Sequence, residues 1–150
     1  MSGATAPCAR RAAHAWRLLF AAWVLALAAT LGALFIGEVL GEQPCVLCWY
    51  QRICMFPLAP ILFVATLRAD AAVWRYALPL SVMGALVAAY HTAQIAGIVP
   101  AAMTPCTAAG PSCTGASMTI MGVVPIPLLA FAAFAAITTL LELLRQGERS

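Results

Sequence analysis

The chain has 150 residues, of which 64% are hydrophobic and only 9% are charged, and its mean hydropathy is +0.96. Soluble domains carry roughly 25% charged residues, so a water-soluble globule is excluded; disorder is excluded because it needs low hydrophobicity and high charge. The net charge of +3 comes from eight arginines and five acids, and these arginines do not cluster as a nucleic-acid groove would require. Composition therefore indicates a membrane protein with a single domain, residues 1–150, and no nucleic-acid partner.

The first two membrane spans are predicted from uncharged runs. Leu18–Gly37 contains no charge over 20 residues, about the length that crosses a ~30 Å hydrocarbon core. A secretory signal has a shorter apolar region of ~7–15 residues, so a span over 18–37 is favoured. After a polar link, the run 46–67 is apolar except for Gln51 and Arg52. It predicts the second span.

The second half of the chain must fold back on itself. It contains no charged residue from Tyr76 to Leu141, and a single helix of that length would run to about 100 Å. Glycine and proline cluster between Gly97 and Gly115, which indicates a loop. The predicted spans are 76–98 and 121–144, and the predicted outer loops are 38–45 and 99–120.

The arginines predict the orientation. Seven of the eight lie before the first span, between the second and third, or after the fourth, and the outer loops contain none. The positive-inside tendency makes the arginine-rich side cytoplasmic and places both termini there. The expected fold class is an all-α membrane protein, an up-down four-transmembrane-helix bundle with both termini cytoplasmic.

Cys45 and Cys48 form a Cys-x-x-Cys motif directly after Pro44, at the outer start of the second span. Residues three apart on a helix share a face, so a disulfide can join the two sulfurs. Unpaired amides and the helix dipole at a helix N-terminus favour a thiolate over a thiol. The motif favours a pair suited to thiol–disulfide exchange over two small buried apolar side chains.

Arg52 is a lone cation about one turn inside the second span. This placement is costly unless something compensates the charge, so Arg52 is a candidate functional residue. At ~100° per helical residue, Cys45, Cys48 and Arg52 fall on one stripe. There the cation would stabilise a thiolate or an anionic ligand. The alternative is that its side chain only reaches back to the outer interface.

Cys106 and Cys113 lie in the second outer loop, with six residues between them. Disulfides persist on the oxidising side of a membrane, and a short exposed loop makes a disulfide reducible by a partner. This favours a second redox pair over a structural clip. Cys8 and Cys54 have no obvious mate, and no role is assigned to them.

His91 lies in the outer part of the third span, at a depth comparable to that of Arg52. A single intramembrane histidine is either a hydrogen-bonded contact between helices or a group near a ligand, and both interpretations stay open. A c-type haem is not indicated, because Trp49 follows Cys48 where that motif needs a histidine.

The chain resembles the DsbB family of membrane disulfide-forming oxidoreductases, over roughly residues 16–144. The similar features are the run PCVLCWYQR at 44–52, Tyr90-His91, the later pair Pro105-Cys106 to Cys113, and Ile126-Pro127. The Cys-x-x-Cys-x-Tyr-x-Arg core is specific to that family. The short spacing between the loop cysteines resembles the short-loop, BdbC-like branch.

This resemblance implies a protein-dithiol:quinone oxidoreductase of the bacterial cytoplasmic (inner) membrane, with its redox loops facing the periplasm or cell exterior. Electrons would pass from a DsbA-like thioredoxin-fold oxidase, which attacks Cys106, to ubiquinone or menaquinone, supporting disulfide bond formation. The chain would act as a monomer in the lipid. The implied catalytic residues are Cys45, Cys48, Cys106 and Cys113, and the implied quinone-binding residues are Arg52 and His91.

Two alternatives stay open. A vitamin-K-epoxide-reductase-like enzyme also pairs a Cys-x-x-Cys motif with a quinone, but on a later helix than the second span. The second alternative is a non-enzymatic membrane protein whose outer cysteines bind Zn²⁺ or copper. Under the redox interpretation no resident metal is expected.

Overall fold

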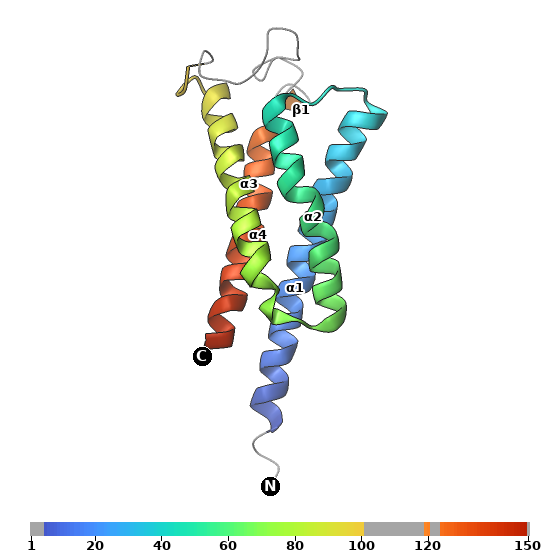
Figure 1. Ribbon diagram of the computed structural model, residues 1–150, viewed down its shortest axis with the longest axis vertical. Helices are drawn as coiled ribbons and strands as arrows, with labels where there is room; N and C mark the ends of the chain where they lie inside the picture. Colours follow the sequence, from blue (N-terminus) through green and yellow to red (C-terminus); the bar gives the residue numbers. More distant parts are fainter. Residues whose placement is uncertain (1–4, 101–118, 121–123, 150) are drawn as a thin grey trace.

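Four long helices run side by side along the length of the molecule (Figure 1). The computed structural model describes residues 5–100, 119–120 and 124–149. The long helices are α1 (Thr5–Leu34), α2 (Val46–Arg68), α3 (Trp74–Ile95) and α4 (Ile126–Arg149). The shorter elements are the π-helical turn η1 (Phe35–Val39), the 3-10 turn η2 (Ala71–Val73) and the antiparallel strands β1 (Thr119–Ile120) and β2 (Val124–Pro125).

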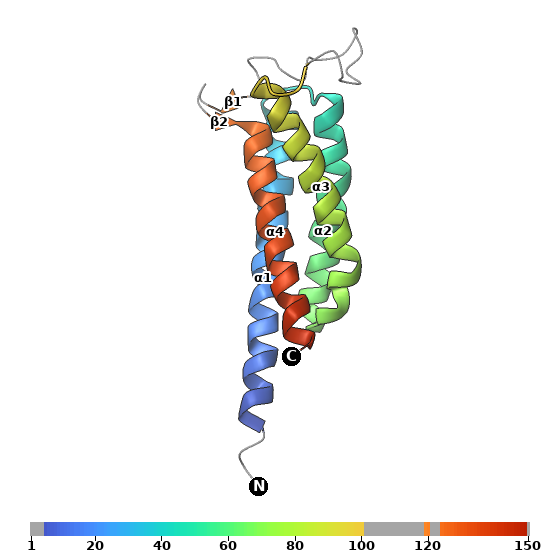
Figure 2. The ribbon, with the colours of Figure 1, turned by 90° about the vertical axis from the view of Figure 1, so that its left-hand side faces the viewer.

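Consecutive helices point in opposite directions, which gives the bundle two distinct ends (Figures 1 and 2). The terminal end holds both chain termini and the connection from α2 to α3. The distal end holds η1, the start of α2, the end of α3 and the two strands. The start of α2 carries the Cys-x-x-Cys motif, so the candidate chemistry lies at the distal end.

The predicted all-α four-helix bundle is confirmed, because all four helices are long and apolar enough to cross a membrane. The two-residue strands depart from purely helical structure. They also explain a difference in the last span: α4 begins at Ile126, later than residue 121, because β2 pairs with β1 before the helix begins.

The outward-facing side chains of the bundle are apolar. Leu31, Ile53 and Leu86 are 56%, 61% and 66% exposed, and none of them meets the core. Large apolar surfaces of this kind are rare on soluble monomers and normal on a helix bundle surrounded by lipid. The surface therefore agrees with a multi-pass membrane protein.

Close packing joins α3 to α4 in the core. A Cβ placed on Gly84 would overlap the ring of Phe134, which is fully buried. The absence of a side chain at Gly84 thus lets the ring lie directly against the α3 backbone, the kind of approach that small residues permit between membrane helices. Below this contact the hydroxyls of Ser81 and Thr138 are 3.0 Å apart and share a hydrogen bond.

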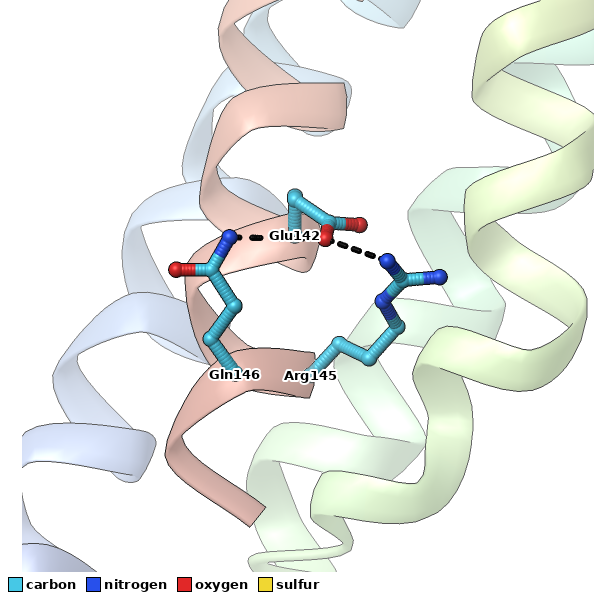
Figure 3. Close-up of polar contacts among 3 residues, drawn as sticks. All are labelled: Glu142, Arg145 and Gln146. Atoms are coloured by element: carbon cyan, nitrogen blue, oxygen red, sulfur yellow. Dashed lines mark hydrogen bonds and ion pairs between the residues drawn. The ribbon is translucent and has the colours of Figure 1, made fainter. Parts of the chain in front are cut away.

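A polar cluster ties α4 to the start of α3 at the terminal end. Glu142 forms an ion pair with Arg145 and accepts a hydrogen bond from Gln146 (Figure 3). The Glu142 oxygen lies 2.6 Å from the Arg145 nitrogen and 3.4 Å from the Gln146 nitrogen. The Arg145 guanidinium also lies over the Trp74 ring, 5.7 Å from its centroid, and the Trp74 indole donates to Glu148 at 2.6 Å. Tryptophan and arginine are the side chains that collect at a membrane interface.

Candidate active site

Cys45 is the N-cap of α2 and not a helical residue. Its backbone is extended, with φ −69° and ψ 170°, and its sulfur accepts a hydrogen bond from the Cys48 amide at 3.4 Å. The sulfur therefore occupies the place that a serine or aspartate oxygen takes in an ordinary N-cap. The predicted helical stripe is wrong at this residue, because a helical rotation angle does not describe a cap with extended backbone.

The two sulfurs of the motif are 3.1 Å apart, within hydrogen-bonding distance. A disulfide has its sulfurs ~2.05 Å apart, so a shift of about 1 Å converts one arrangement into the other. The hydrogen bond with Cys48 lowers the pKa of Cys45 to about 4; burial of the thiol opposes this shift, and contact with His91 assists it. The contacts with Cys48 and His91 therefore favour the thiolate form of Cys45 when the pair is reduced.

His91 reaches Cys45 from α3. Its Nε2 lies 3.9 Å from the Cys45 sulfur, and its Nδ1 lies 3.1 Å from the Nε2 of Gln51 on α2. The imidazole is fully buried, and Gln51 is 7% exposed. A buried imidazole held on both ring nitrogens has a fixed orientation, so Gln51 positions His91 against the sulfur.

Arg52 lies on the opposite flank, toward α1. Its Nη2 donates a hydrogen bond to the backbone oxygen of Ala33 at 2.8 Å, and its guanidinium lies 5.6 Å from the centre of the Trp49 ring. Gly37, inside the π-helical turn η1, leaves space for the guanidinium: a Cβ there would be 3.0 Å from Nη2. Such π-helical turns occur frequently at functional sites.

A cavity of about 360 Å³ opens beside Cys48 and Arg52, between α1, α2 and α4. Its walls are mostly apolar, and Cys48 and Arg52 are among the few groups in them able to react or carry charge. Cys45 and His91 do not line it. The lining residues that matter below are Gly32, Ala33, Cys48, Gln51, Arg52, Met55 and Phe134. An apolar pocket of this size with few polar groups is typical of a small-molecule site.

The structure thus brings four of the predicted site residues together, in two groups. Cys45 meets His91, and Cys48 shares the cavity with Arg52. The loop cysteines at 106 and 113 lie outside the described residues, as does the side chain at position 8. Cys54 is buried in the main core, away from the cavity.

Sequence reasoning missed two residues of this site. In the sequence, Gln51 stands out only as a polar exception in an apolar run, and Gly37 only as the last residue of a predicted span. The signal for Gln51 was present, because an amide inside a membrane span needs a hydrogen-bond partner. The signal for Gly37 was absent, because its role depends on which side chain the neighbouring helix points at it.

Comparison with known proteins identifies the family. The model of the family described as Disulfide bond formation protein DsbB matches residues 13–144. A protein of Metapseudomonas resinovorans, described as a probable disulfide formation protein, is 57% identical over 131 residues, which cover 87% of this chain and 91% of that relative. The chain belongs to the DsbB family.

Two other relatives are also described as disulfide formation proteins. Disulfide bond formation protein C of Bacillus subtilis (strain 168) is 40% identical over 132 residues, covering 88% of this chain and 94% of the relative. A probable disulfide formation protein of Coxiella burnetii (strain RSA 493 / Nine Mile phase I) is 41% identical over 113 residues, covering 74% and 76%. No solved structure matches the chain. Family membership gives this membrane protein an oxidoreductase role in disulfide bond formation.

Proposed function

We propose that this DsbB-family chain is a protein-dithiol:quinone oxidoreductase that reoxidises a DsbA-like thioredoxin-fold oxidase outside the cytoplasm. The observation that carries this proposal is the cavity beside Cys48 and Arg52. A quinone ring is flat and apolar with two polar oxygens, and it fits a mostly apolar pocket whose wall includes the Cys48 thiol, the Arg52 guanidinium and the Glu42 carboxylate. Ubiquinone and menaquinone both have this chemistry.

The relay consists of two thiol–disulfide exchanges. In the first, a thiolate of the reduced partner attacks Cys106, the disulfide between Cys106 and Cys113 opens, and the partner leaves oxidised. In the second, a loop thiolate attacks the disulfide between Cys45 and Cys48. The loop disulfide re-forms, and the two electrons now reside on the Cys45–Cys48 dithiol.

The bound quinone supplies the sink for two electrons and two protons. Cys48 faces the cavity and is the sulfur that gives up electrons there, while Arg52 stabilises negative charge that develops at the cavity wall. The Cys45 sulfur, 3.1 Å away, then bonds to Cys48 and restores the disulfide. His91 contacts Cys45 outside the cavity, so we assign it to the sulfur and not to direct contact with the quinone.

The deciding experiment mixes the purified chain with a quinone and a reduced thioredoxin-fold oxidase and follows quinone absorbance. Stoichiometric quinone reduction with oxidation of the partner is the expected result. Cys54→Ser is the matched control, because Cys54 is a buried thiol away from the cavity, and it should keep full turnover. No quinone reduction by the unaltered chain would reject the proposal.

A second variant separates the two redox pairs. Cys106→Ser removes the residue that the partner attacks, so partner-driven turnover should stop. A small dithiol such as dithiothreitol can still reduce the Cys45–Cys48 pair, so part of its quinone reduction should survive. Equal losses with both reductants would show that the loop pair is structural.

The proposed location is the bacterial inner membrane, with the distal end facing the periplasm or cell exterior. In intact cells, a maleimide that cannot cross the membrane should label reduced Cys106 and Cys113 and leave Cys8 unlabelled. Labelling of Cys8 from outside would reverse this orientation.

A further inference from the structure

Three soft donor atoms meet at the distal end of the bundle. They are the sulfurs of Cys45 and Cys48 and a ring nitrogen of His91, and all lie within 4.8 Å of one another. Among residues 5–100, 119–120 and 124–149, no other group of three histidine, cysteine or acidic side chains comes as close. The donors come from the N-cap of α2, its first turn and α3, so helix packing itself holds them together.

The spacing of these donors suits a three-coordinate metal ion. A metal bound at ~2.3 Å to two sulfurs and ~2.0 Å to a nitrogen, with donors 120° apart, keeps its donor atoms about 4 Å from one another. The Cys45 sulfur and His91 Nε2 are already 3.9 Å apart. The two sulfurs, at 3.1 Å, need only to separate by about 1 Å.

Gln51 completes the arrangement. A histidine that binds a metal through one ring nitrogen donates its other N–H to a neighbouring acceptor, which fixes the ring. The Gln51 amide lies 3.1 Å from His91 Nδ1. Rotating that amide by half a turn presents its oxygen to Nδ1–H and leaves Nε2 to face the metal.

The donor set selects the metal. Two thiolates and one imidazole are soft to intermediate ligands, which favour Cu(I) and Zn(II) over Mg²⁺ or Ca²⁺. Zn(II) takes four ligands, whereas three donors satisfy Cu(I). Among the described residues three such donors meet here, which matches Cu(I) and is one fewer than Zn(II) takes.

We infer that the reduced Cys45–Cys48 pair and His91 bind one Cu(I) ion. The protons that remain on the reduced pair leave, two Cu–S bonds and one Cu–N bond form, and no electron is transferred. The cluster then carries one net negative charge, which the positive charge of Arg52 partly compensates. Because both sulfurs are held by the metal, the disulfide cannot re-form, so Cu(I) keeps this pair reduced.

The test uses the full-length chain with Cys8, Cys54, Cys106 and Cys113 replaced by serine, so that other thiols cannot bind copper. The protein is reduced, kept without oxygen, and titrated with the Cu(I) complex of bathocuproine disulfonate, whose colour fades as copper leaves it. One Cu(I) per chain should be withdrawn, and the same chain with its Cys45–Cys48 disulfide formed should withdraw none. X-ray absorption of the loaded protein should show two sulfurs and one nitrogen.

Variants identify the ligands. Cys48→Ser should remove binding, and His91→Ala should weaken it at least ~10-fold. Gln51→Leu should weaken it ~10-fold while keeping the two-sulfur, one-nitrogen coordination. His14→Ala is the matched control, because His14 is an exposed histidine on α1 and should leave the affinity unchanged.

Unchanged affinity in His91→Ala, a copper centre with sulfur ligands alone, or no copper withdrawn by the reduced chain would each overturn the inference. If His91→Ala fails to fold, the absorption spectrum of the unaltered site decides between these outcomes. The inference rests on the dithiol that the proposed relay generates. The titration contains neither quinone nor partner, so its failure is distinguishable from failure of the relay.

Discussion

The two sulfurs of the Cys-x-x-Cys motif are 3.1 Å apart yet lie in different environments. Cys45 caps α2, is 1% exposed and packs against His91. Cys48 is part of the helix, is partly exposed and lines the cavity with Arg52. Because the two cysteines are three residues apart at the start of a helix, one sulfur lies on the packed flank beside His91 and the other lies on the open flank beside the cavity. A disulfide between them would connect the two flanks, and the two sulfurs can have different tasks.

The largest effect is expected from removing either sulfur. Cys45→Ser and Cys48→Ser should each abolish quinone reduction, because the second exchange then has no disulfide to receive electrons. The two variants should differ in reactivity once the other cysteines are replaced by serine. The remaining Cys48 faces the cavity and should react with a small maleimide about tenfold faster than the remaining Cys45, because we expect the burial of Cys45 to slow the reaction more than its lowered pKa speeds it.

Equal alkylation rates would remove the contrast between the flanks, and full turnover in either variant would reject the relay. Cys54→Ser removes a buried thiol away from both flanks and should leave quinone reduction unchanged.

Substitutions of Arg52 test the open flank alone. Arg52→Lys keeps the charge but loses the planar fork of donors, so the KM for quinone should rise while kcat changes little. Arg52→Met also removes the charge and should lower kcat. The activation barrier should rise by roughly 2–4 kcal/mol if the effect resembles loss of an oxyanion donor. Steady-state kinetics of quinone reduction measures both constants.

Single-turnover oxidation of the partner needs only pre-formed disulfides and should survive both Arg52 changes. Wild-type KM and kcat in both variants would mean that Arg52 only reaches toward the interface.

Gly84→Ala tests how the packed core supports the open flank. The new methyl group overlaps the Phe134 ring, and Phe134 also lines the cavity. The ring must move away from α3, so overpacking should cost about 1–3 kcal/mol of stability and the smaller cavity should raise the KM for quinone. The thermal midpoint and the kinetics should both recover in Gly84→Ala/Phe134→Leu. A lower midpoint with unchanged KM would show that the cavity does not depend on this contact.

Gly37→Ala should have the smallest effect. Its methyl group would lie 3.0 Å from Arg52 Nη2, so the guanidinium must shift by a few tenths of an ångström. We expect the KM for quinone to rise about threefold with kcat unchanged, since only positioning is altered. Gly147→Ala, where the new methyl group meets nothing within 4 Å, is the control and should leave the KM unchanged. An equal KM for quinone in Gly37→Ala and Gly147→Ala would show that η1 does not affect the quinone site.

The sequence was sufficient for the bundle, because hydropathy acts over whole segments. It also predicted that Cys48 and Arg52 share a face, since both are helical and one turn apart. It failed for Cys45, whose backbone is extended, because capping geometry is not visible in a periodic pattern. It could not pair Gln51 with His91 or Gly37 with Arg52, because such pairs depend on how each helix is rotated about its axis against its neighbours.

The Cys-x-x-Cys motif lies at the distal end of the bundle, and this has a consequence for membrane energetics. From partner to quinone, the proposed relay as a whole moves two electrons together with two protons, so its overall reaction is electroneutral. A unit charge that crosses the membrane gains or loses ≈ 2.3 kcal/mol per 100 mV, but here no charge crosses the hydrocarbon core. Disulfide formation by this chain would neither consume nor build the transmembrane potential, and it would proceed at the same rate in a de-energised cell as long as oxidised quinone remained.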